Sequence, residues 1–347
     1  MKNKKTIILI SFIFITLILF VISIFVGSSN MSFNEEVNAL FGNGANNHIV
    51  IMQKIRLPRA LAALLVGAAL GLSGLIMQTT LGNDMASPST LGVSNAATFG
   101  ANVSIIVLAG GFLATGNNIS NYFISSNVYS TSFVAFIFAF ASVLITLALC
   151  KLKSFSKETV ILVGIAMGAI FQAFTSLLQF FATDVSLSAA VVWSFGDLSR
   201  ATYTIDLMLL IILVLAFTFF MLFQNHLNVL LSGDDVAKSS GVRVEALRFM
   251  CLLISSILVA VCIANMGIIG FLGIISPHIA KRIFGYNHKY SIPASMLIGS
   301  IILLVSDTLA RTIGNGTQIP VGIITSIIGA PFFLYIIFRR KRGDVNA

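Results

Sequence analysis

Long apolar stretches recur along the chain, separated by short polar segments. A helix that spans a bilayer needs about 20 mainly apolar residues, and ten stretches come close to that length. They are Thr6–Val26, Ala60–Leu81, Leu91–Leu113, Ser132–Cys150, Thr159–Ala182, Ile205–Phe223, Leu247–Ala264, Gly267–Ile283, Ile292–Leu309 and Val321–Phe338. The pattern predicts an all-α integral membrane protein with about ten transmembrane helices.

Two of these stretches allow an alternative interpretation. The first stretch follows Lys2, Lys4 and Lys5, as the apolar core of a cleaved signal peptide also would. The stretch is too long for a signal peptide and no small-residue cleavage site follows it, so we expect a retained helix. As one helix, Leu247–Ile283 would be about 56 Å long, which exceeds a ~30 Å hydrocarbon core. We therefore expect two crossings with a tight turn at Asn265 to Gly267.

The composition excludes a water-soluble globule. Hydrophobic residues make up 57% of the 347 positions and charged residues only 10%, whereas soluble domains carry about 25% charged residues. A net charge of +9 would suggest nucleic-acid binding in a soluble protein. Here the basic residues lie between apolar runs, as in loops beside a lipid bilayer, so we expect the bilayer and no nucleic acid as a partner.

The positions of the basic residues predict the orientation. If the N-terminus lies inside, the inner segments hold most of the 21 basic residues, including the cluster Arg339–Arg342. The outer segments then keep five, which are Lys54, Arg56, Arg59, Arg200 and Arg311. Because basic loops face the cytoplasm, we expect both termini in the cytoplasm and the polar segment 28–57 on the extracytoplasmic side.

Motifs for catalysis or metal binding are missing from the sequence. It has no GxxxxGK[ST] phosphate loop, no HExxH and no GxSxG. Cys150, Cys251 and Cys262 form no CxxC pair and are expected to be buried thiols. Asp307 and Arg311 lie four residues apart, so we expect them to form a local ion pair. We predict no catalytic residue, no metal and no cofactor.

The polar groups inside the predicted spans are mostly uncharged, such as Gln78, Asn95, Gln172 and Gln179. A passage lined in this way suits a bulky, hydrated solute moved by conformational change. An ion-coupled secondary transporter or channel is the alternative of another class, but intramembrane charges, its usual sign, are scarce. An intramembrane enzyme would lack a candidate catalytic group.

The segment between the sixth and seventh spans is the most unusual loop. His226 to Glu245 is long enough for two short helices, with Gly233 and Gly241 as breaks and Asp234 and Asp235 at a helix start. A plain connector could be much shorter. From the residues alone, a docking surface for a partner and an ordered loop without a function are equally favoured.

Four segments, in order along the chain, carry a resemblance to a known family. They are Arg56–Arg59 with Leu65–Gly74 and Gln78, Asn83–Pro88 with Leu91–Ser94, Gly270–Gly273 with Pro277–Ala280, and Ile319–Gly322 with Gly329–Phe333. With them, the chain resembles the FecCD/BtuC-like permease subunits of ABC importers for iron–siderophore, haem and cobalamin compounds. The resemblance implies a type II ABC importer permease fold, a single transmembrane permease domain over 1–347 and cytoplasmic coupling helices in 226–247.

The same resemblance implies partners and a cargo. A cytoplasmic ABC ATPase dimer would hydrolyse ATP, and a solute-binding protein or lipoprotein would deliver the cargo outside. A second permease subunit, identical or related, would complete a homodimer or heterodimer in the plasma membrane of a prokaryote. A ferric siderophore or similar iron complex is the expected cargo, and haem or cobalamin is the alternative.

The resemblance also implies roles for individual residues. The expected ATPase-coupling residues are Leu230, Gly233, Asp234, Ala237 and Gly241, although Ser232 and Ser240 stand where the family commonly has Leu. Arg56, Arg59 and Arg311 would dock acidic residues of the binding protein, unless they anchor helix ends at headgroups or, for Arg311, pair with Asp307. Asn83 and Met85 would form a cytoplasmic gate, unless this turn merely links two helices, because Gly82 and Asp84 depart from the family pattern.

Overall fold

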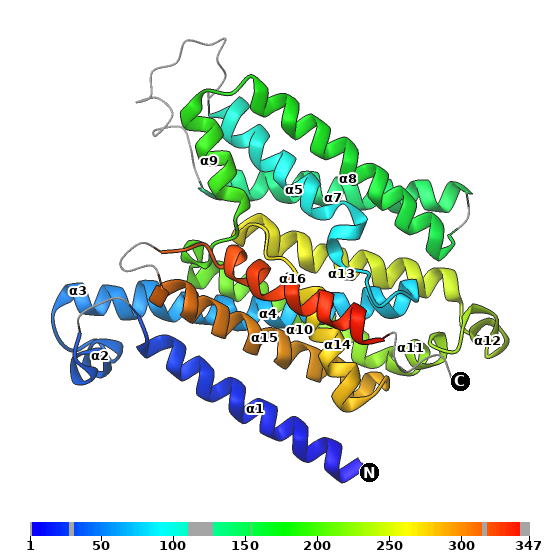
Figure 1. Ribbon diagram of the computed structural model, residues 1–347, viewed down its shortest axis with the longest axis horizontal. Coiled ribbons are helices and arrows are strands. Elements are labelled where there is room, and N and C mark those ends of the chain that lie inside the picture. The colour runs from blue at the N-terminus through cyan, green and yellow to red at the C-terminus, as the bar shows by residue number, and fades with distance from the viewer. Residues whose placement is uncertain (1, 28–30, 110–127, 154, 314–317, 341–347) are drawn as a thin grey trace. The chain divides into compact units, whose positions relative to one another are not determined.

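The apolar stretches fold as helices, and every regular element of the described chain is helical (Figure 1). This computed structural model describes residues 2–27, 31–109, 128–153, 155–313 and 318–340. The elements are α1 (Lys2–Phe25), α2 (Phe33–Leu40), α3 (Asn46–Ile49), the π-helix η1 (Val50–Arg56), α4 (Leu57–Leu81), η2 (Pro88–Leu91), α5 (Val93–Asn102), the π-helix η3 (Val103–Leu108), α7 (Val128–Lys153), α8 (Lys157–Phe180), α9 (Asp184–Ser194), η5 (Leu198–Arg200), α10 (Tyr203–Leu222), α11 (Gln224–Leu230), α12 (Asp234–Ser239), α13 (Val244–Met266), α14 (Leu272–Phe284), α15 (His288–Ile313) and α16 (Val321–Arg340).

Seven helices in this part of the chain are long and apolar enough to cross a membrane. The all-α membrane fold is therefore confirmed, whereas the count of ten crossings stays a prediction. Two predicted spans are short helices. Leu91–Leu113 corresponds to α5 and η3, with its last four positions outside the described residues, and Gly267–Ile283 corresponds to α14 with 13 residues. At 1.5 Å per residue α14 is about 20 Å long, less than a bilayer core.

The break expected after the seventh stretch is present. Helix α13 ends at Met266, and Gly267 has a φ of +74°, a left-handed conformation that glycine adopts without steric cost. Helix α14 begins five residues later at Leu272. A single 37-residue helix is thereby excluded, because the helical conformation ends at this glycine and resumes only at Leu272.

The chain divides into two compact units that each combine distant segments. The first comprises Met1–Leu75, Asp197–Leu213 and Ile269–Ala347, and the second comprises Ile76–Gly196 and Val214–Ile268. Helices α4 and α10 contribute residues to both. The single permease domain expected over 1–347 stays a prediction.

In the first unit, α1 runs alongside α15, and α14 packs against both α15 and α16 (Figure 1). Ala280, Phe284, Ala294 and Ile298 form a buried cluster there, against which side chains of α1 pack. In the second unit, α5 packs on α7 and α8, and α7 also packs on α13. Both cores are therefore built by helix-on-helix packing of apolar side chains.

Helices α4 and α15 approach each other closely within the first unit. A Cβ atom at Gly67 would lie 2.5 Å from the carbonyl oxygen of Gly299, so neither position has room for a side chain. Ser295 and Ser300 of α15 donate hydrogen bonds of 2.7 Å to the carbonyl oxygens of Gly71 and Leu64 of α4. Small residues allow this approach, which replaces the hydrophobic driving force that is missing between helices in lipid.

Candidate functional site

The loop between α10 and α13 folds as the two short helices expected from its glycines. Helix α11 ends at Leu230, Gly233 precedes α12, and Gly241 follows it. Both glycines have positive φ, +106° and +83°, and nothing lies within 4 Å of a Cβ built on either. Glycine is therefore required at these positions by backbone conformation and not by lack of space.

The two short helices present one buried and one exposed face. Leu227, Leu230 and Ala237 are buried, whereas Leu231 and Val236 are 41% and 51% exposed. Exposed apolar side chains outside membrane-spanning helices are typical of surfaces that bind another protein. The buried face fixes the loop to the second unit and leaves its other face open.

Asp234 connects this loop to the helices beside it. Its carboxylate lies 2.6 Å from Nη2 of Arg248 in α13 and 3.1 Å from Nζ of Lys157 in α8. Arg248 is buried and also donates hydrogen bonds to the carbonyl oxygens of Thr80 at 3.2 Å and Phe155 at 2.8 Å. The Arg248 guanidinium thus joins the start of α12 to the end of α4 and to the segment before α8.

These cations also set the charge state of Asp234. Burial alone would raise the pKa of its carboxyl group, but the hydrogen bonds from Arg248 and Lys157 outweigh burial and lower the pKa below the usual 3.8. Asp234 is therefore ionised at neutral pH, and both ion pairs are charged.

The turn after α4 holds the two residues predicted to form a gate. Gly82 has a φ of +58°, and the side chain of Asn83 accepts a 2.9 Å hydrogen bond from the backbone N–H of Met85. Met85 is 47% exposed. Asn83 therefore stabilises the turn, and the Met85 side chain projects from it.

The three arginines predicted to dock a binding protein are buried in the first unit. Arg56 is 5% exposed, and its Nη1 lies 2.8 Å from Glu36 of α2 and 3.2 and 3.1 Å from the carbonyl oxygens of Ile24 and Phe25. This arginine joins the end of α1 to α2 and η1. Gly27 lies against the guanidinium, where a Cβ would be 2.6 Å from Nη2.

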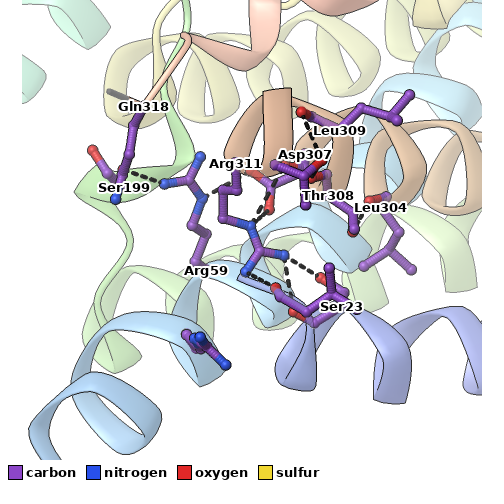
Figure 2. Close-up of polar contacts among 12 residues, drawn as sticks. Ser23, Arg59, Ser199, Leu304, Asp307, Thr308, Leu309, Arg311 and Gln318 are labelled. Carbon is purple, nitrogen blue, oxygen red and sulfur yellow. Dashed lines mark hydrogen bonds and ion pairs between the residues drawn. The ribbon is translucent and has the colours of Figure 1, made fainter. Parts of the chain in front are cut away.

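Arg59 and Arg311 converge on Asp307 (Figure 2). Asp307 is completely buried, and its two oxygens lie 2.8 Å from Nε of Arg59 and 3.0 Å from Nε of Arg311. Arg59 also donates a 2.6 Å hydrogen bond to Gln318. Arg311 reaches α1, where it donates to the carbonyl and hydroxyl oxygens of Ser23. The cluster joins α1, α4 and α15.

The local ion pair predicted for Asp307 and Arg311 is confirmed. The five residues predicted to couple to an ATPase lie in one loop, and their coupling role stays a prediction. The docking role of the arginines stays a prediction, since all three guanidinium groups have internal partners in this conformation. Sequence reasoning missed the partners Glu36 and Arg248, which lie 20 and 14 positions from the residues they bind. No local pattern indicates pairs at such separations.

Comparisons with known proteins agree over nearly the whole chain. A model of the FecCD transport family matches residues 15–339. A Methanocaldococcus jannaschii protein described as an ABC transporter permease is 40% identical over 97% of this chain and 96% of its own. The Fe(3+)-citrate import permease of Bacillus subtilis is 35% identical over 97% and 96%. A solved inward-facing structure titled as a metal-chelate type ABC transporter has a TM-score of 0.80 and 28% identity, and the match covers 96% of this chain and 99% of that one.

Other relatives are named for different cargoes. The iron(3+)-hydroxamate permease of Bacillus subtilis is 31% identical over 97% of this chain and 98% of its own, and the hemin permease of Yersinia pestis is 32% identical over 94% and 95%. The molybdate permease of Haemophilus influenzae is 31% identical over 85% and 83%. These sequence identities are too similar to indicate which of the cargoes this chain transports.

Proposed function

The chain belongs to the FecCD transport family and is an ABC importer permease of the prokaryotic plasma membrane, and we propose that it imports a ferric siderophore or a similar iron complex. The main support for this choice of cargo is the 35% identity to an Fe(3+)-citrate permease over nearly the full length of both chains. Haem is the second candidate because of the 32% identical hemin permease.

Uptake of labelled cargo tests the choice. The permease would be produced together with its ATPase and binding protein in a host that lacks its own iron-chelate importers. We expect ATP-dependent accumulation of ⁵⁵Fe from ferric citrate or hydroxamates. Accumulation of haem or molybdate in place of iron chelates would contradict the proposed cargo while leaving the importer class intact.

We propose that an ATPase dimer binds the loop that contains α11 and α12. Three features support this role: the exposed apolar Leu231 and Val236, the fixed backbone at Gly233, and the Asp234–Arg248 ion pair that joins the loop to α13. ATP binding would close the ATPase dimer, and the motion would pass through the loop to the helices. The passage would then open alternately to each side of the membrane.

Substitutions in this loop test the coupling. Gly233→Ala strains the backbone by about 1–3 kcal/mol, because φ +106° and ψ +159° are essentially limited to glycine. Ala237→Leu inserts a larger side chain at a fully buried position. We expect ATP hydrolysis without uptake in both variants, with normal amounts of permease in the membrane. Ser239→Ala, at an exposed position of α12, is the matched control. Normal uptake in Gly233→Ala and Ala237→Leu would contradict the proposal. Uptake that persists without any ATPase would instead favour an ion-coupled transporter.

We also propose a binding-protein surface on the extracytoplasmic side, around Arg56, Arg59 and Arg311. Because these guanidiniums have internal carboxylates, direct docking requires a carboxylate of the partner to replace Glu36 or Asp307. Complementary charge acts mainly on the association rate. We expect Arg56→Gln to slow the association of the binding protein at low salt, measured by surface plasmon resonance. An unchanged rate with an intact fold would limit Arg56 to a structural role.

The gate and the topology complete the proposal. Asn83 and Met85 would close the cytoplasmic end of the passage, at the interface of two permease subunits. We expect Met85→Cys to react with a membrane-impermeant thiol reagent only from the cytoplasmic side, as should a cysteine placed at Ser239. Labelling of either position from outside intact cells would overturn the orientation, including the cytoplasmic placement of both termini.

A further inference from the structure

A cavity of about 400 Å³ lies where α10, α11 and α13 meet in the second unit. Its volume is in the range of small-molecule binding sites. The residues that line it are mainly apolar, with two basic side chains among them: Phe219, Phe223, His226, Gly241, Val242, Arg243, Ala246, Leu247 and Met250. The coupling role proposed for the loop does not explain this cavity, because only Gly241 of the five predicted coupling residues lines it.

Two rows of side chains line this cavity, one from α10 and α11 and one from the start of α13. Phe219, Phe223 and His226 follow one another at intervals of three or four residues, and the stacked rings of Phe219 and Phe223 have centroids 4.6 Å apart. Arg243, directly before α13, is followed at the same kind of interval by Leu247 and Met250 of that helix. Each row has a basic residue at its loop end and apolar residues toward the membrane span.

Exposed apolar side chains lie on the same helices as the apolar part of the cavity. Leu215 and Leu222 of α10 are 66% and 74% exposed, and Met250 of α13 is 41% exposed. Helix α10 is also one of the seven helices able to cross the membrane. With α10 in the bilayer, Met250, which lines the cavity and is also exposed, offers an acyl chain an apolar contact at the cavity.

The charge of this cavity differs from that of its neighbour. No carboxylate occurs among the described residues that line it, whereas Arg243 and His226 both reach it. A second cavity of about 380 Å³ shares Ala246 and Met250 on the other side of α13, but it contains both Lys151 and Glu245. The first cavity therefore favours an anion next to its apolar part, whereas the second has a carboxylate as well as a cation in its lining.

We propose that the first cavity binds an anionic phospholipid, with the phosphate at Arg243 and His226 and an acyl chain along Phe219, Phe223 and Met250. Basic pockets between transmembrane helices at the cytoplasmic boundary bind anionic lipid headgroups for this reason. A protein partner fits less well, because α10, a helix able to cross the membrane, lines the cavity and no residue of α12 does. The assignment to the inner leaflet rests on the proposed cytoplasmic position of the loop, whereas the binding itself does not.

Native mass spectrometry of the purified full-length permease tests the proposal. The probes are phosphatidylglycerol and phosphatidylcholine with the same acyl chains, each titrated into the detergent-solubilised protein. We expect tighter binding of phosphatidylglycerol, and a roughly fivefold loss of that binding in Arg243→Gln, since each basic group near a headgroup contributes about that factor. Arg243→Lys should restore most of it. Lys151→Gln, in the second cavity, is the matched control and should change it little.

Three results would overturn the proposal. They are equal binding of the two lipids, an Arg243→Gln variant that binds phosphatidylglycerol like the wild type, and displacement of the lipid by inorganic phosphate alone, which would indicate a free-anion site. Because Arg243 is exposed, the variant should fold, and its thermal unfolding checks this. If the loop proves to lie outside the cell, lipid binding would persist and only the leaflet would change, so the two proposals fail separately.

Discussion

Replacing Asp307 with Asn tests what the buried carboxylate contributes between Arg59 and Arg311. Asparagine keeps nearly the same volume, so a cavity cannot explain a loss of stability. The substitution removes the negative charge and leaves two guanidinium groups in a buried environment, 1% and 6% exposed. Removal of one partner from a buried ion pair costs about 3–5 kcal/mol. At the roughly 2 °C per kcal/mol of larger domains, Tm should fall by about 6–10 °C.

The three buried free cysteines, Cys150, Cys251 and Cys262, provide the assay. A thiol-reactive fluorogenic dye labels them only when unfolding exposes them, so fluorescence during heating of the detergent-solubilised permease reports Tm. Arg311→Gln is the comparison variant, because it leaves Arg59 paired with Asp307 and should lower Tm by less. Thr308→Ala is the control, since the Thr308 hydroxyl bonds only within α15.

The order of the Tm values of these variants tests the electrostatic account of the cluster. If Asp307→Asn melts within 2 °C of the wild type, the carboxylate is not needed to offset the two cations. If Arg311→Gln melts at a lower temperature than Asp307→Asn, the hydrogen bonds from Arg311 to α1 matter more than charge balance. Either result would refute the electrostatic account of the cluster.

Two other predictions concern packing and pH. Gly74→Ala should destabilise the fold by about 1–3 kcal/mol, because its Cβ would overlap the carbonyl group of Gly273, whereas Gly270→Ala, whose Cβ has ordinary contacts, should melt close to the wild type. Asp234 has a lowered pKa, so the stability that its ion pair with Arg248 contributes is present above the usual 3.8 and is lost as pH falls through the lower folded value. The Tm difference between wild type and Asp234→Asn should therefore be constant from pH 5 to 8 and shrink below about 3.8, and a difference that already shrinks between pH 7 and 5 would contradict this sign.

The spans and the helix breaks could be predicted because their signals are local. Apolar length identifies α7 and α10, and glycines at positive φ mark the breaks at Gly233, Gly241 and Gly267. Helix α9 was not predicted, because its 11 residues are too few to cross a bilayer and resemble a connector. The π-helical continuation of α4 through η1 has no recognised sequence signal either.

The site was only partly predictable for a related reason. The Asp307–Arg311 pair lies within one helix turn, so spacing reveals it. Arg59 reaches the same carboxylate across 248 positions, and only the packing of α4 on α15 brings the two together. Arginines that look like free docking groups in the sequence are therefore internal cations in the fold.

The contact between α4 and α15 limits how the importer can move. With backbone against backbone at Gly67 and Gly299, and hydroxyl groups of α15 bonded to carbonyl oxygens of α4, these segments cannot slide or tilt without breaking both kinds of contact. These segments of α4 and α15 therefore move as one rigid body, and we expect the hinges of a transport cycle outside them. The distance between a spin label on α4 and one on α15, both placed away from the contact, should stay constant through the whole cycle.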